Sequence, residues 1–428
     1  MFLSTSRGLF AGALLCSSAC SWADSKPVHG ESLSLHQAIS RTLLSNPELA
    51  AFAFELAAQD GRTLQAGLPA NPELVLDLED ALGTGARSGL SELQTTLSLR
   101  KIFERGALAR RVAAAQAGRA VLDAELLEKQ LDTATETARR FARVLADQAR
   151  LDVAREAITQ AEQAVAAVRV RVLAAKSPDA ELARAAAALA RAELEHEDAE
   201  HEWLTGKFQL AAMWGAREVA FDQARGELEP LPELESFAAL SARIQNNPSL
   251  SKFTTEAQLR EAELRLAEQR RKPAWQLAAG IRRFEAGDDF AGVFNVTVPL
   301  SFGDRGQGNM AAAQAKLQQV DATRNAAEVR LLSQVFTLHQ ELAHARHVSQ
   351  KLASDVLPKL TEALQQTEYA YQRGRYGYLE LVAAQRELLE LKRARIQASV
   401  DAYGYAIELD RLTGTVPRSA ATLSAPKQ

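Results

Sequence analysis

The sequence predicts a mainly α-helical protein with a small β part, in which a unit of helix, β-hairpin and long helical hairpin occurs twice. The first sign is the stretch from Ala107 to Lys176, which has no proline and only one glycine, Gly118, among strong helix formers. The second is a set of sequence markers that recur about 200 residues apart. The third is a pair of segments with period-two hydrophobicity after Pro72 and again after Pro273.

Residues 1–23 have the features of a secretory signal peptide. Arg7 supplies the positive charge, residues 9–16 the apolar core, and residues 21–23 a small-x-small cleavage site. We therefore expect the mature chain to begin at Asp24.

The cysteines and the charge narrow the class further. A lipid anchor would use Cys20, but Ser17 stands where such a site needs leucine or a similar residue. Cys16 and Cys20 are the two cysteines of the chain, so cleavage leaves a protein without disulfides or thiol chemistry, as suits an oxidising compartment. The formal net charge of −4 lends no support to a nucleic-acid partner. No later apolar run is long enough for a membrane-spanning helix.

The duplication is visible in paired markers at a near-constant offset. They are Asn46-Pro47-Glu48-Leu49 with Asn247-Pro248-Ser249-Leu250, Pro72 with Pro273, Arg105-Gly106 with Arg305-Gly306, Ala113-Ala114-Ala115-Gln116-Ala117 with Ala311-Ala312-Ala313-Gln314-Ala315, Leu182 with Leu381, and Gly215 with Gly414. These markers predict a first repeat over 24–215, a linker over 216–234, a second repeat over 235–414 and a tail over 415–428.

Each repeat is expected to contain the same elements in the same order. Leading helices are predicted over 33–44, 48–68, 235–245 and 248–271; strands over 73–80, 92–101, 274–284 and 292–302; and helical hairpins over 105–214 and 305–412. Pro358 should kink the long helix of the second hairpin.

The longest predicted helix, 105–172, has a narrow apolar seam. Apolar residues recur at steps of three and four from Leu151 through Val165 to Val172, and Gln148 is one polar lapse in the same row. About 70 residues make a rod of roughly 100 Å, which needs partner helices along its length.

The predicted strands alternate between an apolar and a mostly polar face. This pattern suits membrane β-strands with lipid on one side and water on the other, although surface hairpins on a soluble core would show it too. The side chains expected to face lipid are Leu97, Leu99, Phe294, Val296, Val298 and Leu300.

Four strands cannot close a barrel, and open edges are not tolerated in lipid. Three chains would give a twelve-stranded barrel, within the known range of membrane barrels. The same threefold axis would gather the helical rods into a tube about 100 Å long. The pattern therefore predicts a homotrimer that forms a conduit through the outer-membrane lipid and the periplasm of a bacterium.

The chain resembles the outer-membrane efflux protein family, the TolC-like channels, and within it the heavy-metal efflux (CzcC-like) branch. The resemblance covers nearly the whole mature chain and rests on Asn46-Pro47-Glu48-Leu49, Leu68-Pro69-Ala70-Asn71-Pro72-Glu73-Leu74, Gly83-Thr84-Gly85, Gly280-Ile281-Arg282-Arg283-Phe284, Val298-Pro299-Leu300 and Arg305-Gly306-Gln307-Gly308-Asn309. One departure is Glu104-Arg105-Gly106-Ala107, where that branch often has a Lys-Arg pair.

The resemblance implies the outer-membrane channel of a tripartite efflux system, with a periplasmic adaptor protein and an inner-membrane pump of the resistance-nodulation-division (RND) class as partners. Its cargo would be heavy-metal cations of the cobalt, zinc, cadmium and nickel class. A duct for drugs or secreted peptides is the alternative of the same class. A periplasmic coiled-coil adaptor or scaffold without a barrel is the alternative of another class.

Two groups of residues invite a metal-site interpretation. Glu197 and His201 lie one turn apart on a predicted helix, with His196 next to Glu197, and Glu341, His344 and His347 repeat a spacing of three. A solvated, charge-rich helix face is the favoured interpretation of both groups, since a duct that bound metal tightly would release it slowly. We expect no firm metal site, no cofactor and, since no catalytic constellation is present, no enzyme.

The turns of the two helical hairpins are the predicted partner-docking and gate sites. They lie farthest from the strands, and their composition departs from that of the rods. Tyrosine and arginine are favoured at interface centres, and glycine permits close approach of another backbone. The residues are Lys176, Ser177, Pro178 and Asp179 at one turn, and Arg373, Gly374, Arg375, Tyr376 and Gly377 at the other.

Overall fold

The computed structural model describes residues 32–104, 106–300 and 302–417. The predicted signal peptide, with Cys20 and the expected start at Asp24, lies outside the described residues. So does the tail beyond residue 417.

The protein is mainly helical with a small sheet, as the sequence predicts. The first part of the chain contains α1 (Leu35–Ser45), α2 (Pro47–Ala66), β2 (Glu73–Glu79), β3 (Gln94–Phe103), α3 (Ala107–Leu173) and α4 (Asp179–Ala212). The second contains α5 (Phe237–Arg243), α6 (Pro248–Arg270), β5 (Trp275–Phe284), β6 (Asp289–Thr297), α7 (Gln307–Lys351), α8 (Leu357–Gln372) and α9 (Tyr378–Leu412). Two short strands, β1 (Ser32–Leu33) and β4 (Gln223–Ala224), pair in parallel.

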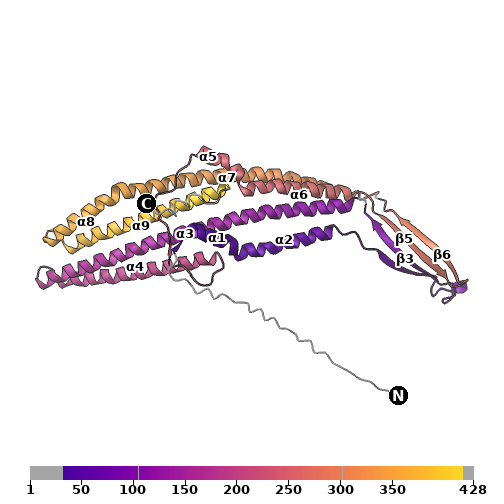
Figure 1. Cartoon of the computed structure of the whole chain (residues 1–428), viewed down its shortest axis with the longest axis horizontal. Coiled ribbons are helices and arrows are strands. Elements are labelled where there is room, and N and C mark those ends of the chain that lie inside the picture. Colours follow the sequence, from indigo (N-terminus) through magenta and orange to yellow (C-terminus); the bar gives the residue numbers. More distant parts are fainter. Residues whose placement is uncertain (1–31, 105, 301, 418–428) are drawn as a thin grey trace, which may run out of the picture.

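The molecule is elongated, with the four-stranded sheet at one end and the turns of the two helical hairpins at the other (Figure 1). Helix α3 is 67 residues long and runs through the whole helical part. It contacts α4 and α9 on the hairpin side and α2 and α6 on the sheet side. These partners supply the packing that a helix of such length requires.

The polar lapse in the seam of α3 has a structural cause. The side-chain oxygen of Gln148 accepts a hydrogen bond from the backbone N–H of Ala224 at 2.7 Å. The side-chain nitrogen of Gln148 donates a second one to the backbone carbonyl of Ala224 at 3.2 Å. Gln148 therefore pairs with β4 as a neighbouring strand would. It fixes the linker between the two halves of the chain against the middle of α3.

The Asn-Pro markers lie where two helices meet end to end. Asn46 caps α2 by accepting from Glu48 N at 2.9 Å, and its amide donates to the carbonyl of Met213, at the end of α4, at 2.7 Å. Asn247 repeats this arrangement: it accepts from Ser249 N at 2.7 Å and donates to the carbonyl of Leu412, at the end of α9, at 2.9 Å. Each asparagine thus satisfies one orphan donor and one orphan acceptor.

The glycine markers belong to the same two junctions. Gly215 and Gly414 have φ of +74° and +72°, a conformation that favours glycine. A Cβ on Gly414 would lie 2.3 Å from the carbonyl oxygen of Asn246. The helical part therefore consists of four long rods. They are α4 continued by α2, the unbroken α3, α9 continued by α6, and α7 continued by α8.

The long helix of the second hairpin is irregular close to Pro358, where the sequence predicts a kink. A π-helical turn, Leu352–Val356, separates α7 from α8. It lies directly before Pro358, whose ring nitrogen cannot donate the hydrogen bond of a regular helix. The extra residue per turn accommodates the missing bond.

The fourth strand also differs from its prediction over 292–302. Strand β6 starts at Asp289 and ends at Thr297, which pairs with Gln276 near the start of β5. Pro299 follows, and it has no N–H with which to continue the ladder.

The described residues contain no helix with both the length and the apolar composition needed to cross a bilayer.

Candidate functional site

The sheet is antiparallel throughout, in the order β2-β3-β5-β6. Strands β3 and β5 have ten residues each and form its centre, while β2 and β6 each have one edge without a strand partner among the described residues. Strands of nine to eleven residues are long enough to cross a bilayer at a tilt.

One face of this sheet is apolar and uncovered. The register aligns Leu97 with Leu76 and Ile281, so the apolar positions of all four strands fall on the same side. Their exposed fractions run from 40% for Leu277 to 85% for Phe294. The other members are Leu74, Leu78, Leu99, Trp275, Phe290 and Val296.

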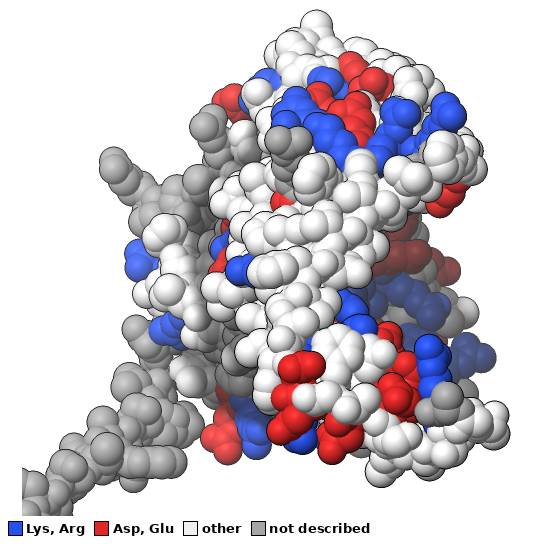
Figure 2. Space-filling model, turned by 90° about the vertical axis from the view of Figure 1, so that its right-hand side faces the viewer, with Lys and Arg blue, Asp and Glu red and all other residues white. Residues whose placement is uncertain are grey.

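Charges on the apolar face occur only near its two ends. Lys101 pairs with Leu277, directly beside the pair Phe103–Trp275 at the end of the sheet nearest the helices. Arg283 lies at the opposite end, near the loops. Viewed from the sheet end, uncharged side chains form a broad band between two groups of charged residues (Figure 2). An apolar band with aromatic residues at its margin is typical of a lipid-facing barrel surface.

The opposite face is polar and internally braced. Arg282 on β5 donates to Thr96 Oγ1 at 2.8 Å on β3, and its guanidinium reaches Glu79 on β2 at 2.9 Å. It also donates to Gln94 Oε1 at 2.9 Å. One arginine therefore ties three strands together. Gly280 permits their close approach, because a Cβ there would lie 2.3 Å from the carbonyl oxygen of Leu97.

The residues predicted to face lipid divide into two groups. Leu97, Leu99, Phe294 and Val296 lie on the exposed apolar face. Val298 and Leu300 lie beyond the end of β6, so their assignment to the strand is wrong. Both side chains are exposed, and their contact with lipid stays a prediction.

At the far end of the molecule, one arginine joins the two hairpin turns. Arg171 on α3 donates to the carbonyl of Tyr371 at 2.6 Å and to Ser177 Oγ at 3.1 Å. Its guanidinium also lies 4.6 Å from the ring centre of Tyr371, within reach of a cation–π interaction. Of the residues predicted at the first turn, Ser177 is held in place by its hydrogen bond from Arg171.

The hydroxyl groups of two tyrosines are buried beside this contact. Tyr371 and Tyr378 are 2% and 3% exposed, and neither hydroxyl has a hydrogen-bond partner in the described part of the chain. Burial raises the pKa of both phenols, and nearby Glu181 adds to the effect. Both rings pack in an apolar cluster with Val168 and Leu381.

The outer surface of the turns is basic and partly apolar. Lys176, Arg373 and Arg375 are exposed, and the guanidinium of Arg373 lies 4.4 Å from the ring centre of Tyr369. Tyr376 is 49% exposed. Gly374 has φ of +74° with open space around it, and Gly377 precedes α9, where its N–H donates to Glu380. Pro178 precedes α4, which begins at Asp179.

The candidate metal ligands are not gathered into a site. Glu197 and His201 are exposed on α4, and His196 is half-buried. Glu341, His344 and His347 are exposed on α7. Within the described residues, no group of three or more His, Cys, Asp or Glu side chains is placed to hold a metal ion. Neighbouring Glu195 pairs with Arg393 on α9 at 2.6 Å.

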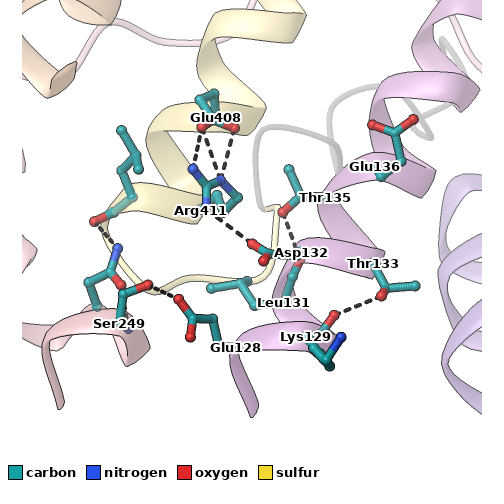
Figure 3. Close-up of polar contacts among 12 residues, drawn as sticks. Glu128, Lys129, Leu131, Asp132, Thr133, Thr135, Glu136, Ser249, Glu408 and Arg411 are labelled. Atoms are coloured by element: carbon teal, nitrogen blue, oxygen red, sulfur yellow. Dashed lines mark hydrogen bonds and ion pairs between the residues drawn. The ribbon is translucent and has the colours of Figure 1, made fainter. Parts of the chain in front are cut away.

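A polar network joins α3, α6 and α9 at the level of the helix junctions (Figure 3). Arg411 on α9 contacts Glu408 at 2.6 Å and Asp132 on α3 at 3.0 Å. Ser249 at the start of α6 donates to Glu128 on α3. The network holds the Asn247 junction against the continuous helix.

Sequence reasoning missed the roles of Arg171, Arg282 and Arg411. Each acts on residues distant in sequence, so no local pattern distinguishes it from the other arginines. The roles of Asn46 and Asn247 could have been found, because both repeat before a proline and pair with a repeated glycine.

The comparisons with known proteins decide the family. The family described as Outer membrane efflux protein matches residues 38–216 and 239–415. The chain belongs to this family. It is an outer-membrane efflux protein.

Two relatives are from Cupriavidus metallidurans. The cobalt-zinc-cadmium resistance protein CzcC is 26% identical over 89% of this chain and 90% of its own length. The nickel and cobalt resistance protein CnrC is 27% identical over 70% and 72%. A crystal structure of the channel-forming protein CusC matches 90% of this chain and 92% of that one, with a TM-score of 0.72 and 17% identity. This last likeness shows the fold.

Proposed function

We propose that three copies of this chain form the passive exit duct of a tripartite efflux system for heavy-metal cations of the cobalt, zinc, cadmium and nickel class. The observation that carries the proposal is an antiparallel sheet with two open edges and one uncovered apolar face. Such a sheet is stable in lipid only when its edges are closed by further copies. The names of CzcC and CnrC support the metal cargo.

The strand directions favour closure by identical copies. Because four antiparallel strands alternate in direction, β6 of one copy and β2 of the next run antiparallel when placed side by side. Three copies then form a twelve-stranded barrel with the apolar face outward, and Leu97, Leu99, Phe294 and Val296 face lipid.

The helical body has matching edges. In each copy, α3 and α9 lie between α4 and α7. Large apolar side chains are exposed on both outer helices: Leu194, Leu204 and Phe208 on α4, and Val329 and Phe336 on α7. A head-to-tail ring buries both sets against each other and closes a periplasmic tube.

We further infer that residues 24–215 and 235–414 are two copies of one unit, joined by 216–234. The repeated Asn-Pro junctions and the two segments that match the family support this division.

The basic hairpin turns are the proposed docking site for the periplasmic adaptor, and their separation opens the duct. The duct catalyses no reaction, and the inner-membrane pump supplies the energy.

The experiment expresses the chain in cells that lack their own metal-efflux channel but retain its adaptor and pump. We expect heat-modifiable trimers in the outer membrane, restored growth in cobalt, zinc or cadmium salts and no change in drug resistance. Restored drug resistance without metal resistance would favour the drug duct. A monomer in the soluble periplasmic fraction would favour a scaffold.

A further inference from the structure

The charges on the polar face of the sheet are unequal. The register places four carboxylates there, Glu73, Asp77, Glu79 and Asp289, and two guanidinium groups, Arg100 and Arg282. Each arginine forms an ion pair with one carboxylate: Arg100 lies 3.6 Å from Glu73, and Arg282 lies 2.9 Å from Glu79.

Asp77 remains without a counter-charge between these two pairs. Its carboxylate is exposed and has no hydrogen-bond or ion-pair partner among the residues that the structure describes. The residue opposite is Thr96, whose hydroxyl already accepts from Arg282. Asp289 stands apart at the outermost position of β6, next to the loop.

We propose that Asp77 forms, with its two symmetry copies, an anionic ring inside the barrel that makes the duct cation-selective. This inference rests on the proposed trimeric barrel. Rings of aspartate or glutamate are a general means of cation selection in pores.

The dimensions support an effect that reaches the axis. Twelve strands about 4.8 Å apart and tilted by about 40° give a barrel radius of about 12 Å. A carboxylate that points inward from this wall lies within about 10 Å of the axis, which is the Debye length at 0.1 M salt. At 1 M salt the Debye length falls to about 3 Å, so most of the lumen is screened.

The test measures reversal potentials of purified wild-type trimer in planar bilayers under a KCl gradient. We expect wild type to prefer K⁺ over Cl⁻, and Asp77→Asn to shift the reversal potential toward zero at about 0.1 M but little at about 1 M salt. Asp77→Arg should move it toward the Cl⁻ potential. Arg100→Gln, which frees Glu73, should move it in the opposite direction from Asp77→Asn.

The outcomes separate this inference from the proposal on which it rests. Channels in which Asp77→Asn and Asp77→Arg keep the wild-type reversal potential overturn the ring. If wild type forms no conducting channel at all, the trimeric duct itself fails. Trimer yield and heat modifiability of each variant confirm that a changed potential does not reflect misassembly.

Discussion

The side chains of Asn46 and Asn247 each join the ends of two helices. At both positions the oxygen caps one helix while the nitrogen binds the last turn of another, so two helices continue as one rod. Asn247 is the more enclosed of the two, at 2% exposure.

We expect Asn247→Ala to lower the free energy of unfolding by about 2–4 kcal/mol, because it removes a helix cap and leaves the carbonyl of Leu412 without a partner. Asn247→Asp keeps the cap oxygen but places a buried carboxylate against that carbonyl, so it should not restore the lost stability. Chemical denaturation of detergent-solubilised protein, followed by circular dichroism, measures both. Equal stability of Asn247→Ala and wild type would remove the junction from the account of rod continuity.

The histidines of α4 lead to a second expectation at this scale. Because Glu197 and His201 are exposed and no third ligand lies beside them among the residues that the structure describes, purified protein should bind zinc, cobalt or cadmium no tighter than about 1 mM, roughly −4 kcal/mol. Isothermal titration calorimetry on wild type and on the double variant His196→Ala with His201→Ala tests this. Micromolar binding that the double variant abolishes would contradict it.

At the scale of elements, strand β6 separates its two faces over adjacent residues. Val296 lies on the exposed apolar face and Thr297 on the polar one. Because Val296 shares its row with Lys101 near the helical end of the sheet, Val296→Arg should cost less than the about 2–4 kcal/mol per chain of an arginine at the bilayer midplane, while Thr297→Arg should be milder still because it faces water. The readout is the amount of heat-modifiable trimer in outer-membrane fractions. Equal damage by both substitutions would show that the proposed faces are assigned incorrectly.

The α8–α9 turn is the second element whose function can be tested by substitution. Gly374→Glu and Tyr376→Ala should abolish efflux but leave the amount of trimer unchanged, since both residues lie outside the buried apolar cluster that contains Tyr371 and Tyr378. Gly374→Asn is the matched control, because asparagine tolerates positive φ better than most residues. Cellular metal accumulation measures efflux.

Crosslinking tests the same turn directly. Cysteine placed at Arg375 should crosslink to the adaptor, and cysteine at Gly287, in the loop of the other hairpin, should not. Full efflux in both turn variants, or adaptor crosslinks confined to the middle of the rods, would exclude the turn from docking.

At the scale of the whole molecule, the single chain exposes what a closed assembly needs. Two sheet edges, an apolar sheet face and apolar side chains on the outer helices are all uncovered. A soluble monomer rarely leaves this much apolar surface open. These uncovered surfaces support the proposed closure by further copies of the chain.

The sequence by itself determined the class of the fold and the family. Helix content, the stops at Pro72 and Pro273, and the alternation of the strands follow from local propensity and periodicity. The duplicated Asn-Pro and glycine markers are also visible without a structure. These properties depend on neighbours a few residues away, so a linear reading suffices.

Only the tertiary structure decided which side chains act across the chain. Gln148 appears as a flaw in an apolar seam until Ala224 is placed beside it. Arg282 becomes a brace, and Asp77 an unbalanced charge, only once the strand register is known. The end of β6 at Thr297 depends on where its partner begins. Each of these contacts joins residues far apart in sequence, and its energy arises from packing and pairing that no local pattern encodes.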